Sequence, residues 1–149
     1  MSACAVASDA DAIGRATGQG VRILVADTGV EAEHPLLAGP PIQTFHVRDL
    51  GEGYGLLVSP EPARDLFGHG TAVASIVRRL APGATIDSLR LLDKRVSSER
   101  ILAGLLWAID RGYDIVNCSF GTTDRVFLRD YKECVDAAFC RNVLIVSAC

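Results

Sequence analysis

Short apolar runs alternate along this chain with segments of helical periodicity. Four runs have the length and apolar content of buried strands: Val21–Ala26, Ala84–Leu92, Tyr113–Cys118 and Asn142–Cys149. Three segments between them are predicted helices: 71–80, the segment from Ser97 or Ser98 to the residue before Gly112, and 126–141. Strands joined through helices form parallel sheets by right-handed crossovers. The sequence therefore predicts an α/β fold, a mostly parallel sheet with helices on both faces.

Each predicted helix has one apolar face, which we expect to pack on the sheet. The faces consist of Ala72, Val73, Ile76, Val77 and Leu80, of Ile101, Leu102, Leu105, Leu106 and Ile109, and of Leu128, Tyr131, Val135, Ala138 and Phe139. Two other segments are less regular. Residues 9–18 are predicted as a short helix before a turn at Gly18–Gly20, and 31–67 as irregular chain around a short strand at Ile42–Val47.

Length and composition indicate one globular domain. The chain has 149 residues, of which 49% are hydrophobic, and a net charge of −3. The acidic balance argues against a nucleic-acid partner, and no apolar run reaches the roughly 18 residues that span a bilayer. The N-terminus lacks the basic start and apolar stretch of a secretory signal. We expect a single domain over 1–149, with 1–16 as an N-terminal extension.

The cysteines indicate a reducing compartment. There are five of them, an odd number, and no pair has Cys-x-x-Cys spacing. This usage is typical of reduced thiols, so we expect a cytoplasmic protein that does not bind membranes. The three histidines, His34, His46 and His69, lie far from the cysteines in the sequence. A zinc site is therefore not expected.

The tripeptide Asp27-Thr28-Gly29 directly follows the first predicted strand. Ligands of parallel sheets bind beyond the carboxyl ends of the strands, so a carboxylate there is placed to hold and polarise another group. The tripeptide alone is a weak signal. Aspartic proteases use the same three residues, and a purely structural turn is an equally good interpretation.

A histidine between two glycines, Gly68-His69-Gly70, opens the next helix. Glycine loses more backbone entropy on folding than other residues, so two of them at a helix start indicate a close approach of backbone or substrate. An imidazole can act as a general base near neutral pH. A histidine that only caps or packs is the alternative, and the preceding Asp65 makes that alternative weaker.

Taken together, the two motifs resemble a known family. Thr17–Pro35 around Asp27 and Asp65–Ile76 around His69 resemble, in the same order, the first two signatures of the subtilases, the subtilisin-like serine proteases of peptidase family S8. The resemblance implies a subtilisin-like fold and a catalytic role for both residues. In that role, Asp27 orients His69 and stabilises its imidazolium, and His69 takes the proton from a serine.

Three further stretches extend the resemblance to the end of the chain. They are Ala81–Ile86, Trp107–Gly121 and Val143–Cys149. Ser119, Phe120 and Gly121 match the family's Ser-Leu-Gly segment, with phenylalanine in place of leucine. The resemblance implies that this segment pairs with substrate backbone and forms a wall of the specificity pocket.

The sequence also departs from the family pattern. The oxyanion asparagine and the Gly-Thr-Ser segment that carries the nucleophile are absent from these 149 residues. Thr122 and Thr123 follow Gly121 but are better interpreted as the start of a helix. The isolated chain is therefore predicted to be inactive and its domain to be incomplete at the C-terminal end, where Val143–Val146 needs a cover. The rim segment Leu89–Ser97 lacks the glycine that the family usually has there, so we expect an unusual cleft rim.

Three interpretations stay open at this stage. The chain is part of a serine-type endopeptidase that acts on polypeptides, or a non-catalytic relative that binds extended peptides along Ser119–Gly121, or one subunit of a split protease whose partner chain supplies the serine. No cofactor is expected from the residues themselves. The resemblance leaves calcium open, although the sequence has no dense Asp/Asn loop.

Overall fold

A computed structural model describes residues 16–50, 55–92, 97–121 and 125–148. Its strands are β1 (Arg22–Asp27), β2 (Gly29–Val30), β3 (Thr44–Asp49), β4 (Leu56–Pro60), β5 (Arg64–Asp65), β6 (Thr85–Arg90), β7 (Ile115–Cys118) and β8 (Leu144–Ser147). Its α-helices are α2 (His69–Leu80), α3 (Ser98–Asp110) and α4 (Leu128–Cys140), and the short 3-10 helices are η1 (Pro35–Leu37) and η2 (Arg125–Phe127).

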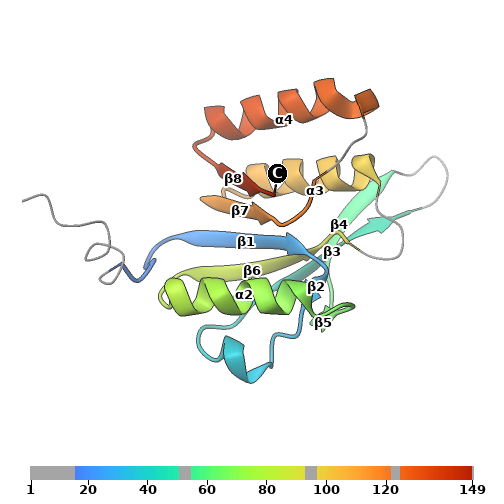
Figure 1. Cartoon of the computed structure of the whole chain (residues 1–149). Coiled ribbons are helices and arrows are strands. Elements are labelled where there is room, and N and C mark those ends of the chain that lie inside the picture. The colour runs from blue at the N-terminus through green and yellow to red at the C-terminus, as the bar shows by residue number, and fades with distance from the viewer. Residues whose placement is uncertain (1–15, 51–54, 93–96, 122–124, 149) are drawn as a thin grey trace, which may run out of the picture.

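Six strands form the main sheet, in the order β4-β3-β6-β1-β7-β8. All neighbours in it run parallel except β3 and β4, which are antiparallel. Helix α2 covers one face, and α3 and α4 cover the other (Figure 1). The predicted α/β fold with helices on both faces is therefore confirmed. The four predicted long strands and the short one near residue 44 all exist, with ends shifted by a few residues, as hydrogen-bond definitions commonly shift them.

The apolar run of β1 is explained by burial on both faces. Leu24 and Ala26 belong to the larger core, which lies between the sheet and α3 and α4. Val25 points the other way, into a smaller core with Ala74 of α2 and Ile86 of β6. Side chains of a strand alternate between faces, so a central strand with two covered faces needs apolar residues at every position. Packing on both faces therefore holds β1, the strand that ends at Asp27, in place at the centre of the sheet.

The predicted apolar face of α2 is wrong in part. Ile76 and Leu80 are 49% and 60% exposed, whereas Thr71, Ala74 and Arg78 are buried. The helix lies close to β1 and β2, and small residues permit that approach where larger apolar ones do not. Arg78 is accommodated because its guanidinium donates to the carbonyl oxygens of two residues, Pro40 at 2.7 Å and Ala84 at 3.4 Å.

The predicted face of α4 is likewise only partly correct. Ala138 is buried as expected, but Val135 and Phe139 are exposed, and Cys134 takes the core position instead. In α3, Ile101, Leu102, Leu105 and Ile109 are buried and Leu106 is half exposed. Ser97 is the N-cap of α3, as predicted, and accepts a hydrogen bond from the Arg100 amide.

Residues 31–67 contain more regular structure than predicted. Besides β3, the described part of this segment includes η1, β4 and β5. The edge strand β4 ends at Pro60, a position where proline is tolerated because no ladder hydrogen bond is lost. Of the predicted helix at 9–18, residues 9–15 lie outside the described ranges and 16–18 are not helical, while the turn at Gly18–Gly20 is present.

Strand β8 lies at one edge of the sheet. Its Ile145 packs against the larger core, under α4. Leu144 and Val146 point to the opposite face and are 58% and 43% exposed. On that face α2 lies against β1 and β2. Apolar side chains on β8 are therefore left in contact with solvent.

Candidate functional site

Asp27 and His69 come together at the carboxyl end of β1. Asp27 is the last residue of that strand, and His69 is the first residue of α2. The Nδ1 atom of His69 lies 2.8 Å from Oδ1 of Asp27, a hydrogen-bond distance. The two residues are 42 positions apart in sequence, so their contact depends on how α2 packs on the sheet.

Glycines allow this close packing. A side chain on Gly70 would overlap the carbonyl oxygen of Gly29, and its Cβ would also lie 3.2 Å from the Cβ of Asp27. Gly29 itself has a φ of 103°, which L-residues with a side chain rarely adopt. The close approach expected from the glycines beside His69 is thus an approach of the α2 backbone to the turn after Asp27.

The environments of the two side chains differ sharply. Asp27 is fully buried, and its Oδ1 also accepts a 2.7 Å hydrogen bond from the Thr28 amide. The His69 side chain is 54% exposed. The hydrogen bond to Asp27 and the charge of that carboxylate raise the pKa of His69, with a smaller contribution from the charge of Asp65. Because Nδ1 faces Asp27, Nε2 is the ring atom left to exchange a proton with a ligand.

Asp65 lies at the N-terminal end of α2. Its two carboxylate oxygens accept hydrogen bonds from Thr28, Phe67, Gly68 and Thr71, and Thr71 donates both its amide and its hydroxyl. Burial opposes the ionised form, but these hydrogen bonds outweigh it and lower the pKa of Asp65. The sequence pointed to Asp65 as a neighbour of the histidine motif, but not to its contacts with Thr28 and Thr71.

The segment Ser119–Gly121 directly follows β7, the strand beside β1. Ala26 and Cys118 are partners in that register, so Asp27 and Ser119 leave the sheet at the same level. The Ser119 hydroxyl is 3.0 Å from Oδ1 of Asn117. Within the described residues, no serine or threonine hydroxyl forms a hydrogen bond with His69, and the segment is not bonded to the Asp27–His69 pair.

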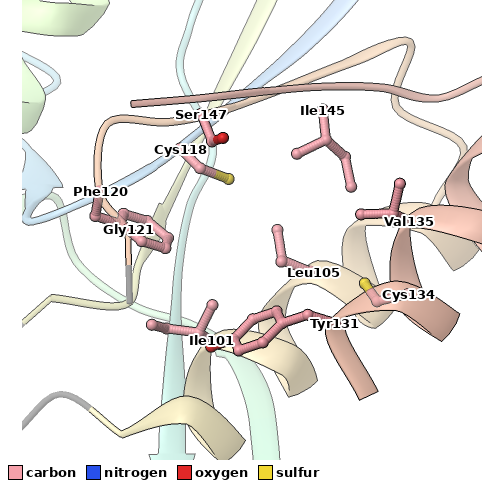
Figure 2. A pocket seen from close by; sticks show the side chains of 10 residues that line it. All are labelled: Ile101, Leu105, Cys118, Phe120, Gly121, Tyr131, Cys134, Val135, Ile145 and Ser147. Carbon is pink, nitrogen blue, oxygen red and sulfur yellow. The ribbon is translucent and has the colours of Figure 1, made fainter. Parts of the chain in front are cut away.

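A cavity of about 200 Å³ lies behind this segment. Figure 2 shows Phe120 and Gly121 on one side of it, with side chains of α3, α4 and β8 completing the lining. The lining is mainly apolar and includes Ile101, Leu105, Tyr131 and Ile145. Cys118 also lines it, and burial raises the pKa of its thiol to about 12, helped by Cys134 and Asp27. Sequence reasoning named Phe120 but missed the cavity, because its lining residues come from distant segments.

The described residues contain neither a metal-binding cluster nor a membrane-spanning helix. No group of three or more His, Cys, Asp or Glu side chains there is placed to hold a metal ion. Among the helices of the same ranges, none has the length and apolar character to cross a bilayer.

Comparisons with known proteins agree with the geometry. The chain is 31% identical over 142 residues to an intracellular serine protease of Paenibacillus polymyxa, a match that covers 88% of this chain and 41% of that protein. It is 29% identical over 147 residues to subtilisin E of Bacillus subtilis (strain 168), covering 89% of this chain and 34% of subtilisin E. The chain thus spans less than half the length of each relative.

Solved structures of proteases are similar to this chain as well. The crystal structure of a lanthipeptide protease superposes with a TM-score of 0.72 at 25% identity, covering 89% of this chain and 40% of that one. The structure of a psychrophilic protease, S41, superposes with a TM-score of 0.70 at 25% identity, covering 89% and 46%. The model of the subtilase family, peptidase S8, matches residues 18–149. With that match over most of its length, this chain belongs to the subtilase family.

Proposed function

We propose that this chain supplies the aspartate and the histidine of the catalytic triad of a subtilisin-like serine endopeptidase. One observation carries the proposal: a buried carboxylate, Asp27, holds Nδ1 of a half-exposed imidazole, His69, at 2.8 Å. This is the arrangement that a serine hydrolase needs to move a proton. The family membership of the chain supports the same assignment.

The roles of the two residues follow from their positions. Asp27 accepts a hydrogen bond from the Nδ1–H group of His69, which fixes the tautomer with a free lone pair on Nε2. When a serine hydroxyl attacks a peptide carbonyl, Nε2 takes the hydroxyl proton, and the buried charge of Asp27 stabilises the imidazolium. The same nitrogen then returns the proton to the leaving amine, and a water molecule hydrolyses the acyl-enzyme.

The proposed substrate is a polypeptide bound in extended form. Ser119–Gly121 leaves the sheet beside the catalytic pair, and its backbone can add a substrate strand by β-type pairing. Phe120 forms part of an apolar cavity next to that backbone. A side chain of the bound peptide can enter the cavity, which gives the segment a role in specificity.

The family's Gly-Thr-Ser segment and oxyanion asparagine do not occur in the 149 residues of this sequence. We propose that a further segment, either a continuation of the polypeptide or a partner chain, carries them and covers the exposed Leu144 and Val146 of β8. The isolated chain lacks the group that attacks the substrate and the donors that stabilise the oxyanion. It is therefore proposed to be inactive on its own.

An active-site label tests the proposal. A fluorophosphonate reacts with a serine only when the histidine activates it. The isolated chain should remain unlabelled. The chain combined with a serine-bearing segment, encoded downstream or on a partner, should be labelled on that serine. His69→Ala and Asp27→Asn should each abolish or strongly reduce labelling. Undiminished labelling in both variants of the combined protein would refute the assignment.

A non-catalytic role in peptide binding is the second candidate. The apolar cavity beside Ser119–Gly121 favours it, because that cavity does not need the serine to accept a side chain. Binding of an extended peptide to the isolated chain, measured by calorimetry, would support this role. A Phe120→Ala variant should then bind more weakly. Location in the cytoplasm is proposed as well, supported by the three free cysteines in the described part of the chain and by the name of the Paenibacillus relative.

A further inference from the structure

A second carboxylate, Asp65, is hydrogen-bonded to residues on either side of the proposed catalytic pair, beside Asp27 and beside His69. Its Oδ1 accepts 2.7 Å and 2.8 Å hydrogen bonds from the Thr28 hydroxyl and the Gly68 amide. Its Oδ2 accepts from Thr71, with 2.8 Å to the amide and 2.6 Å to the hydroxyl. Thr28 directly follows Asp27, and Gly68 directly precedes His69. The carboxylate thus joins the backbone beside each member of the pair.

The Thr28 hydroxyl completes a second connection. It donates to Asp65 and accepts a 3.0 Å hydrogen bond from the amide of Gly70. The residue after Asp27 is therefore tied to the residue after His69 through one oxygen, and that oxygen is held by Asp65. A change in the position of Asp65 therefore alters the Asp27–His69 distance through these hydrogen bonds, and not through a direct contact of Asp65 with either side chain.

Asp65 also replaces a missing helix cap. The N-cap residue of α2 is Gly68, which has no side chain to accept from the first amides of the helix. A polar N-cap side chain commonly accepts a hydrogen bond from the amide of the third helical residue. Here that amide belongs to Thr71, and it donates to Asp65 instead. A negative charge at a helix N-terminus is stabilised by the helix dipole. The negative charge of Asp65 also acts on the imidazole of His69, the residue that begins the helix.

We propose that Asp65 is a positioning residue of this site, which holds His69 in register with Asp27 and supplies a second negative charge toward its imidazolium. The proposal rests on the proposed function, because it assigns Asp65 a role toward the same pair. Among the described residues, the charged groups that act on His69 are Asp27 from β1 and Asp65 from β5, and Glu31 lies behind Asp65, accepting from its amide at 3.0 Å. Asp65 does not touch the reacting atoms, so it acts through His69.

NMR titration of the whole chain tests this without any need for activity. The pKa of His69 and the low-field signal of its Nδ1 proton are followed in the wild type and in Asp65→Asn. The variant keeps the size of the side chain but removes the charge. We expect a lower His69 pKa and a weaker or broader Nδ1 signal. Asp27→Asn should lower the pKa further and abolish the low-field signal.

Matched controls separate positioning from simple capping. Asp114→Asn removes a carboxylate that also accepts from a backbone amide, that of Arg22, far from His69 in the fold. It should leave the His69 titration unchanged. If Asp65→Asn lowers the unfolding free energy but leaves the pKa and the Nδ1 signal of His69 as in the wild type, Asp65 is only a helix cap and the proposal is wrong. If Asp65→Asn does not fold, Asp65→Ser, which restores an acceptor without the charge, takes its place.

The same spectra test the proposed function separately from the role of Asp65. A wild-type His69 without a raised pKa and without a low-field Nδ1 signal would contradict the Asp27–His69 pair itself. A normal wild-type pair that is insensitive to Asp65→Asn would contradict only the role of Asp65. The two failures are therefore distinguishable in one set of spectra.

Discussion

At the scale of single residues, the missing side chain of Gly70 lets α2 lie close enough to β1 for His69 to contact Asp27. The neighbours of Gly70 are the Gly29 carbonyl oxygen and the Cβ of Asp27. In Gly70→Ala, the new methyl group must push α2 away from the turn after β1. Overpacking of this kind typically costs about 1–3 kcal/mol. We expect a lower free energy of unfolding in urea and loss of the Nδ1 signal of His69.

Gly121→Ala is the matched control for stability. Among the described residues, a Cβ at Gly121 would have one neighbour, the Ala148 carbonyl oxygen at 3.7 Å, an ordinary contact distance. Its unfolding free energy should therefore stay close to that of the wild type. Equal stability of Gly70→Ala and Gly121→Ala would show that α2 can move away from β1 without cost.

The titration of His69 gives a second prediction, concerning pH. The hydrogen bond to Asp27 raises the pKa of His69 in the folded protein. The folded state therefore binds the proton more tightly than the unfolded chain, whose histidine pKa is about 6.5. His69 stabilises the fold fully below that pH, and the contribution is lost as pH rises through the folded pKa. The unfolding free energy should fall over this window, and less so in His69→Gln. An identical pH dependence in wild type and variant would contradict the raised pKa.

At the scale of elements, the packing face of α2 is open to a direct test. Ala74 is fully buried between the helix and β1, whereas Ile76 is half exposed. Ala74→Leu adds volume to a filled space and should cost about 1–3 kcal/mol. Ile76→Ala removes a side chain that is already half in water and should cost less than about 1 kcal/mol. Urea denaturation of the isolated chain measures both, and the reverse order would restore the face predicted from the sequence.

Strand β1 and helix α2 show what sequence patterns can and cannot determine. The apolar run predicts β1 because both faces of a central strand are covered, and the rule that ligands bind at the carboxyl ends of parallel strands points to Asp27 at its end. The apolar spacing of α2 gave the helix but selected Ile76 and Leu80, because spacing does not report how closely a helix lies on its sheet. The contacts of Asp65 and the cavity behind Phe120 depend on distant residues, which no local pattern contains.

At the scale of the whole molecule, the two faces of the sheet are covered unequally. Helices α3 and α4 form one large core with the sheet, and α2 forms the smaller core on the other face (Figure 1). Strand β8 is at the edge, with Leu144 and Val146 exposed on the α2 side. An apolar strand at a sheet edge is a site for pairing with another chain. We therefore expect the isolated chain to self-associate through β8 as its concentration rises.

Substitution on the exposed face of β8 tests this expectation. Leu144→Lys together with Val146→Lys places two charges where apolar side chains now meet water, and charged edge strands resist pairing. Sedimentation velocity should show less association for this double variant than for the wild type, at unchanged unfolding free energy. Ile145→Lys is the opposite control, because Ile145 packs against the larger core and a charge there should unfold the chain rather than dissociate it. A wild-type chain that stays monomeric at all concentrations would show that the exposed edge of β8 is too short to pair, and the cover proposed for Leu144 and Val146 would then lose its physical basis.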